Sequence, residues 1–224
     1  MTLENLVFDS IERLDPVAIA RKDASKTVEK PEVNVNILAL DLANKCGWAV
    51  RCRDGRVLHG TVNFTPKDGW SPGQRWQRFR SWLASIIVEH QVGAIVYEQV
   101  LQGGWKGGNA GHRSGAAGDL YGGFKALVEL AADSHNTTLD TANVATVKKL
   151  WTGNGRADKA EMVAEASRRG FRVRDDNEAD ALGILHWAIA KETGAWKPAP
   201  KKPKPKHPAP GRRVAPAAPG LFTE

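Results

Sequence analysis

The core of the protein begins in residues 35–64, VNILALDLANKCGWAVRCRDGRVLHGTVNF, where three strand patterns follow one another. Residues 35–42 are a short apolar run, which is typical of a buried strand. The alternation in 46–53 predicts a second strand, and the Asp-Gly pair that follows is a strong hairpin signal. Residues 56–64 then predict a third strand, antiparallel to the second. The core therefore starts as an antiparallel sheet.

Helix and strand patterns alternate after this sheet. Residues 74–91 have apolar side chains at helical spacing, and 93–99 (GAIVYEQ) predict a fourth strand. After a glycine-rich segment we expect a helix at 121–134, a strand at 138–141, helices at 144–151 and 157–169, a short strand at 171–173 and a helix at 178–192. Hairpins followed by alternation indicate an α/β protein with a mixed sheet flanked by helices.

The two ends of the chain differ in composition from the core, which we place at 35–196. Residues 1–34 predict an N-terminal extension with a short amphipathic helix and a polar linker. Residues 197–224 hold eight of the twelve prolines and seven basic residues, but only one acid. This composition indicates a disordered, Lys/Pro-rich basic tail. Such a tail suits sequence-independent contacts to nucleic-acid phosphates.

Composition excludes several classes of protein. The 224 residues carry a net charge of +7 and are 42% hydrophobic, which is ordinary for a globular protein. No apolar run reaches the roughly 18 residues that a membrane helix needs, and no secretory signal is visible. The two cysteines, Cys46 and Cys52, make neither a disulfide framework nor a zinc site. We therefore expect a cytoplasmic protein with reduced thiols.

Two acidic residues stand near the ends of apolar strand patterns. Asp41 lies within ILALDL and Glu98 within AIVYEQ. A carboxylate in an apolar strand is costly unless it is paired or binds a cation. If these strands are parallel neighbours, their carboxyl ends bring both side chains to the sheet edge where α/β proteins bind ligands.

A third acidic cluster, 175–180 (DDNEAD), leads into the last predicted helix. Asn177 is a suitable N-cap, and acids are common in a first helical turn. Asp180 lies on an apolar face and shares a helical side with Asp176 and Asn177. Converging carboxylates repel unless hard cations such as Mg²⁺ or Mn²⁺ lie between them. Two such ions about 3.5–4 Å apart support phosphoryl hydrolysis, so the spacing indicates a metal-dependent nuclease.

Four motifs in order resemble the RuvC family of Holliday-junction resolvases, in the RNase H-like superfamily, and most of all its phage branch. They extend over residues 36–189 and read ILALDLANKCGWAV, IVYEQV, VKKLWTGNGRADKAEM and NEADALGI. The resemblance implies an RNase H-like mixed sheet of five strands, three antiparallel and then parallel ones, flanked by helices on both faces.

The resemblance also implies an activity and its residues. The family resolves four-way junctions in DNA by paired symmetric nicks that leave a 5′-phosphate and a 3′-hydroxyl. It acts as a homodimer with two Mg²⁺ ions per subunit, for which Mn²⁺ substitutes. By match to the motifs, Asp41 bridges both ions, and Glu98 and Asp180 complete the site. Lys159 stabilises charge at the scissile phosphate, and Lys148 holds the DNA backbone.

Three neighbouring residues are candidates for the fourth metal ligand. Asn177 occupies the position where the best-known members have an acid or a histidine, three residues before the last acid. Asn177 through its amide oxygen, Asp176 and Glu178 are the candidates. Asp176 is favoured because its i,i+4 spacing faces Asp180.

Further DNA contacts are expected from the glycine-rich loop 102–118 and from the turn before the helix at 157–169. Family members often have an aromatic residue that stacks on unpaired bases where this chain has Leu101, so Trp105 is the alternative. Backbone amides at the start of the helix at 157–169 are a candidate phosphate site. The expected DNA-binding residues are Lys148, Lys159, Leu101, Trp105, Lys106, Arg113 and Arg156.

Two alternative functions stay open. The first is a branched-DNA-binding protein with weak or lost catalysis, which the departure at Asn177 motivates. The second is a broader debranching nuclease that also cuts flaps and three-way junctions. A sugar-kinase-like ATPase is disfavoured, because the chain is too short for two such domains and has no second phosphate hairpin.

Overall fold

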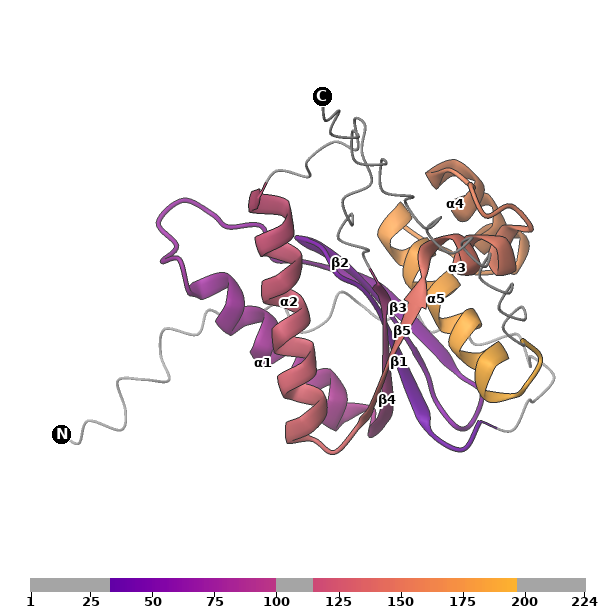
Figure 1. The fold of residues 1–224 in the computed structure, drawn as a ribbon, viewed down its shortest axis with the longest axis horizontal. Coiled ribbons are helices and arrows are strands. Elements are labelled where there is room, and N and C mark those ends of the chain that lie inside the picture. The colour runs from indigo at the N-terminus through magenta and orange to yellow at the C-terminus, as the bar shows by residue number, and fades with distance from the viewer. Residues whose placement is uncertain (1–32, 100–114, 197–224) are drawn as a thin grey trace, which may run out of the picture.

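A computed structural model describes residues 33–99 and 115–196, which build one five-stranded sheet between two helical layers (Figure 1). The strands are β1 (Asn36–Asp41), β2 (Lys45–Arg51), β3 (Val57–Asn63), β4 (Val92–Gln99) and β5 (Thr138–Asn143). Their order across the sheet is β3-β2-β1-β4-β5. The first three are antiparallel, and β4 runs parallel to both β1 and β5. The predicted mixed sheet is confirmed.

Helices cover both faces of the sheet, as expected (Figure 1). On one face lie α1 (Gln74–Glu89) and α2 (Gly115–Ser134). On the other, α5 (Asp176–Glu192) crosses β1 and β2, with α3 (Val144–Thr152) and α4 (Lys159–Arg168) packed against it. Among the described residues, no helix is both long enough and apolar enough to cross a membrane.

Strand alternation decides which face each acidic side chain joins. In β1, Leu38 and Leu40 pack in the core cluster with α1 and α2, whereas Ala39 packs in the cluster under α5. Since successive side chains point to opposite faces, Asp41 falls on the α5 face. The same alternation in β4 puts Glu98 on that face. Both acids therefore lie on the side of the sheet that α5 covers.

The start of α5 differs from the prediction. The N-cap is Asp175, whose carboxylate accepts a hydrogen bond from the Glu178 backbone amide, and the helix begins at Asp176. The expected N-cap at Asn177 and helix start at 178 are therefore wrong. The backbone of Asp175 is extended, with φ −150° and ψ 175°, which is the conformation that a capping residue needs.

Two further elements differ from the pattern-based expectation. Helix α2 starts at Gly115 rather than 121, so the glycines at 115 and 118 do not break it. Within the predicted range, Gly123 permits close packing against α1, since a Cβ there would lie 2.5 Å from the Trp76 ring. Residues 171–173 form no strand and pair with no strand of the sheet, and Phe171 packs its ring against Trp151 and His186.

The predictions for the two chain ends are not tested. The tail at 197–224 and nearly all of the extension at 1–34 lie outside the described residues. Within the described core, Cys46 and Cys52 are both buried and free, as expected of reduced thiols.

Candidate metal and nucleic-acid site

Asp41 is the last residue of β1, and Glu98 is the next-to-last residue of its parallel neighbour β4. Leu40 of β1 pairs with Tyr97 of β4, so the next residues, Asp41 and Glu98, follow side by side. Asp41 pairs on its other side with Gly47 of β2. The parallel pairing expected of the two acidic strands is confirmed, and it brings both carboxylates to the same edge of the sheet.

The first two turns of α5 add two carboxylates to this edge. Asp176 is the first residue of α5 and Asp180 lies four residues on, so both project from one side of the helix. Burial and then the charges of Asp180, Glu98 and Asp176 raise the pKa of Asp41 to about 8, while Lys159 lowers it. β1, β4 and α5 therefore contribute acids to one electrostatically coupled site.

Asp180 is also difficult to ionise. Burial and, to a smaller extent, the charge of Asp176 raise its pKa to about 6 against the opposing charges of Lys148 and Lys159. Buried carboxylates of this kind favour protonation or a bound cation, because the charged form loses its hydration. The site thus has the charge character that attracts a divalent cation.

The two candidate lysines lie beside these acids. The Lys159 ammonium donates to the Asp176 carboxylate, which lowers the Asp176 pKa, and the Lys159 side chain is 79% exposed. Lys148 Nζ donates to the Ala157 carbonyl oxygen at 2.7 Å. Arg156 is exposed in the same α3–α4 connection. Lys148 of α3 and Lys159 of α4 therefore act on the acidic edge, and Arg156 adds a third cation in the connection between these helices.

The expected phosphate site at the start of α4 is blocked by carboxylates. Asp158 caps the helix and accepts a hydrogen bond from the Glu161 amide at 2.8 Å. Glu161 in turn accepts one from the Asp158 amide at 2.7 Å. Two carboxylates at this end repel a phosphate and occupy two of the backbone amides that would bind it.

The acids at this edge offer carboxylate oxygens, and these are the ligands that hard divalent cations such as Mg²⁺ prefer. Within residues 33–99 and 115–196, no three His, Cys, Asp or Glu side chains lie close enough together to hold a metal ion. Asp176 is turned toward Lys159 instead. Cation binding therefore requires side-chain rotation toward a common point and loss of a proton from Asp41.

The contacts of Glu178 remove it from the candidate ligands. Its side chain is 1% exposed and bonds to His59 and Arg174. Two residues along a helix turn the direction of a side chain by about 200°, so Glu178 points away from Asp176 and Asp180. Of the three candidates for the fourth ligand, Asp176 is close enough for its charge to raise the pKa of Asp41.

Gly47 is a site residue that the sequence interpretation missed. A Cβ built on it would lie 1.9 Å from the Asn177 carbonyl oxygen, so the first turn of α5 rests directly on β2. A glycine inside a predicted strand often marks such a close backbone approach, and this was the available signal. The missing side chain lets α5 bring its acids to Asp41.

Four of the expected DNA-binding residues lie in a segment that the structure does not describe. Leu101, Trp105, Lys106 and Arg113 fall within 100–114. Their proposed contacts with bases and phosphates therefore stay predictions.

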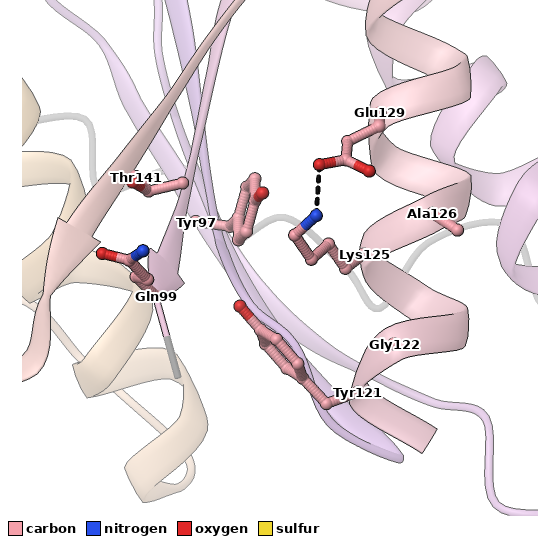
Figure 2. A pocket seen from close by; sticks show the side chains of 8 residues that line it. All are labelled: Tyr97, Gln99, Tyr121, Gly122, Lys125, Ala126, Glu129 and Thr141. Carbon is pink, nitrogen blue, oxygen red and sulfur yellow. Dashed lines mark hydrogen bonds and ion pairs between the residues drawn. The ribbon is translucent and has the colours of Figure 1, made fainter. Parts of the chain in front are cut away.

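A pocket of about 430 Å³ lies on the opposite face of the sheet, between β4, β5 and α2 (Figure 2). The ion pair between Lys125 and Glu129 extends into it, and the Tyr121 hydroxyl donates to the Glu98 backbone carbonyl at 2.9 Å. Its lining consists of Tyr97, Gln99, Tyr121, Gly122, Lys125, Ala126, Glu129 and Thr141. Strand alternation separates this pocket from the carboxylate site.

Comparison with known proteins identifies the fold. No protein-family model and no curated protein sequence matches the chain. A structure of Thermus thermophilus RuvC in complex with a Holliday junction substrate superimposes with a TM-score of 0.59 and 18% identity, over 74% of this chain and 100% of that one. A second structure of Thermus thermophilus RuvC gives a TM-score of 0.54 and 19% identity, over 71% and 97%. The chain therefore has the RuvC fold.

Proposed function

We propose that this protein is a metal-dependent, structure-selective DNA endonuclease that resolves four-way junctions by paired symmetric nicks. The observation that carries the proposal is that acids from β1, β4 and α5 gather at one edge of the sheet, where burial and then the charges of Asp180, Glu98 and Asp176 raise the pKa of Asp41 to about 8. The RuvC structure with a Holliday junction substrate supports the substrate class, since the fold is shared. The four sequence motifs support membership of the RuvC family and of its phage branch.

Four acids are proposed to hold two Mg²⁺ ions per subunit, with Mn²⁺ as a substitute. Asp41 would be the ligand shared by both ions, and Glu98, Asp180 and Asp176 would complete their coordination. Asn177 is the alternative fourth ligand. Bound divalent cations polarise the scissile phosphate and activate the attacking water. The expected products carry a 5′-phosphate and a 3′-hydroxyl.

The cations of the chain act on the DNA backbone. Lys159 is exposed and anchored on Asp176, so its ammonium is available to a phosphate at the acidic edge, where it stabilises developing negative charge. Lys148 fixes the α3–α4 connection through the Ala157 carbonyl and opposes the charge of Asp180. Arg156 supplies a further phosphate contact from that connection.

The expected assembly is a homodimer in the cytoplasm. Symmetric cuts on two strands require two sites related by a two-fold axis, and each subunit provides one. The basic tail at 197–224 adds phosphate contacts that do not depend on DNA sequence.

The experiment that tests the function is cleavage of a synthetic four-way junction in Mg²⁺, beside linear duplex, flap and three-way DNA. Asp41→Asn is assayed in parallel. Asp133→Asn is the matched control, because Asp133 is an exposed carboxylate on α2, in the other helical layer. We expect paired nicks on the junction alone, lost in Asp41→Asn and kept in Asp133→Asn.

Other outcomes would replace this function with one of the alternatives. Tight junction binding without cleavage in Mg²⁺ or Mn²⁺ would indicate a branched-DNA-binding protein. Equal cutting of flaps and three-way junctions would indicate a broader debranching nuclease. Retained cleavage by Asp41→Asn would remove Asp41 from the site.

A further inference from the structure

Two side chains of β3 hold the first turn of α5. His59 Nδ1 lies 3.0 Å from Glu178 Oε2, and both side chains are 1% exposed. Thr61 Oγ1 donates to Asp175 Oδ1 at 2.7 Å, and Asp175 is the N-cap of α5. His59 and Thr61 are two residues apart in a strand, so they share one face. β3 therefore contacts the start of α5 at two points.

Glu178 is buried between two partners. Its Oε2 faces His59 Nδ1, and Arg174 Nε donates to its other carboxylate oxygen at 2.8 Å. A carboxylate paired with a guanidinium accepts hydrogen bonds, so His59 Nδ1 is the donor. Removal of His59 would leave a buried carboxylate oxygen with one partner fewer.

The contacts from β3 and the acidic site lie on opposite sides of the same helical turn. Asp41 pairs with Gly47, and Gly47 pairs with Thr61, so these residues form one row across three strands. The Asn177 backbone lies over Gly47 in the middle of this row. Any displacement of this turn away from β3 therefore changes the position of Asp180 relative to Asp41.

We propose that His59 and Glu178 are positioning residues, whose buried contact keeps the first turn of α5 in the place where Asp176 and Asp180 can share a divalent cation with Asp41. The inference rests on the proposed function, because it concerns the same cation site. The contact between His59 and Glu178, which are 119 residues apart in the chain, then controls cation affinity as well as stability.

The test measures Mn²⁺ binding to the full-length protein by calorimetry, without DNA, together with the melting temperature. His59→Leu removes the donor at similar volume, whereas His59→Asn keeps a donor near the Nδ1 position. We expect His59→Leu to weaken Mn²⁺ binding by about 10-fold, as loss of an outer-shell partner does, and His59→Asn to restore most of the affinity.

Asn36→Ala is the matched control for stability. Asn36 is also a buried polar residue that links two segments, but it lies at the opposite end of β1 from Asp41. Its Nδ2 donates to the His90 carbonyl at 2.6 Å, and its Oδ1 accepts from the Arg53 amide at 2.7 Å. We expect Asn36→Ala to lower the melting temperature and leave Mn²⁺ affinity unchanged.

The outcomes separate the two proposals. If the wild-type protein binds Mn²⁺ and His59→Leu binds it equally well despite a lower melting temperature, the pair only stabilises the fold and the inference is overturned. If the wild-type protein binds no Mn²⁺, the proposed function fails, and this inference with it. Should His59→Leu not fold, Thr61→Val, which removes the hydroxyl contact to Asp175, takes its place with the same expected loss of affinity.

Discussion

A Cβ atom on Gly47 would lie 1.9 Å from the carbonyl oxygen of Asn177, so β2 and the first turn of α5 are in direct backbone contact. Gly47 is also the strand partner of Asp41. The helix that carries Asp176 and Asp180 thus approaches Asp41 across a residue with no side chain.

Gly47→Ala is expected to destabilise the protein by about 1–3 kcal/mol, as overpacking does, and to reduce junction cleavage because α5 must move away from Asp41. Urea unfolding and cleavage rates measure the two effects. Gly122→Ala is the control. It also replaces a glycine by alanine, but within α2, where the added Cβ would have no atom within 4 Å. Wild-type stability and cleavage in Gly47→Ala would contradict the close contact.

Mn²⁺ binding at pH 7 is expected to release about one proton per subunit. The pKa of Asp41 is about 8, so at pH 7 its carboxyl is mostly protonated, whereas a cation needs the ionised form. Calorimetric titrations in two buffers of different ionisation enthalpy measure the released protons. Asp41→Asn should release fewer. Equal binding heats for the wild-type protein in both buffers would contradict the raised pKa.

Lys159→Gln is expected to slow junction cleavage by about 10²-fold or more, the usual loss for one group that stabilises charge in the transition state. Junction affinity should change much less. The control is Lys191→Gln, because Lys191 is also a partly exposed lysine paired with an aspartate, Asp140, on a different part of the surface. A parallel loss of binding and cleavage would reduce Lys159 to a phosphate contact.

The buried side chain of His186 is expected to lower the free energy of unfolding in mild acid. Burial lowers its pKa from 6.5 to about 4, and its Nδ1 lies 2.9 Å from the Leu182 carbonyl. Between these two values the unfolded chain binds the extra proton, so the free energy of unfolding falls as the pH falls from about 6.5 toward 4. The slope reaches at most about 1.4 kcal/mol per pH unit.

His186→Gln removes this titration, and the difference between the two proteins isolates it. Unfolding by urea at pH 7, 6 and 5 should show the wild-type protein losing stability relative to His186→Gln. This comparison is necessary because the raised pKa of Asp41 acts in the opposite direction. A constant difference across the three pH values would mean that His186 titrates normally.

Removal of residues 197–224 is expected to weaken binding to all DNA forms alike and to reduce the salt dependence of binding. The segment carries seven basic residues and one acid, and each phosphate contact contributes to the slope of log K against log salt. Fluorescence anisotropy over a salt series measures that slope. An unchanged slope would mean that the tail makes no phosphate contacts.

Local patterns were sufficient for most of the fold. Apolar runs and alternation located all five strands, and helical spacing located the helices around them, because each pattern reflects burial on one face. The start of α2 was missed because the glycines at 115 and 118 were interpreted as part of the glycine-rich loop, whereas they lie within the helix.

The sequence alone was sufficient to place acids near the ends of β1 and β4 and at the start of α5, because a carboxylate within an apolar pattern is visible without coordinates. Which acids of that helix face Asp41 depends on the tertiary packing. Glu178 bonds to His59, 119 residues away, and the neighbouring backbone rests on Gly47. Such contacts arise from how β3 and α5 pack across the sheet, and local periodicity carries no information about partners so distant in the chain.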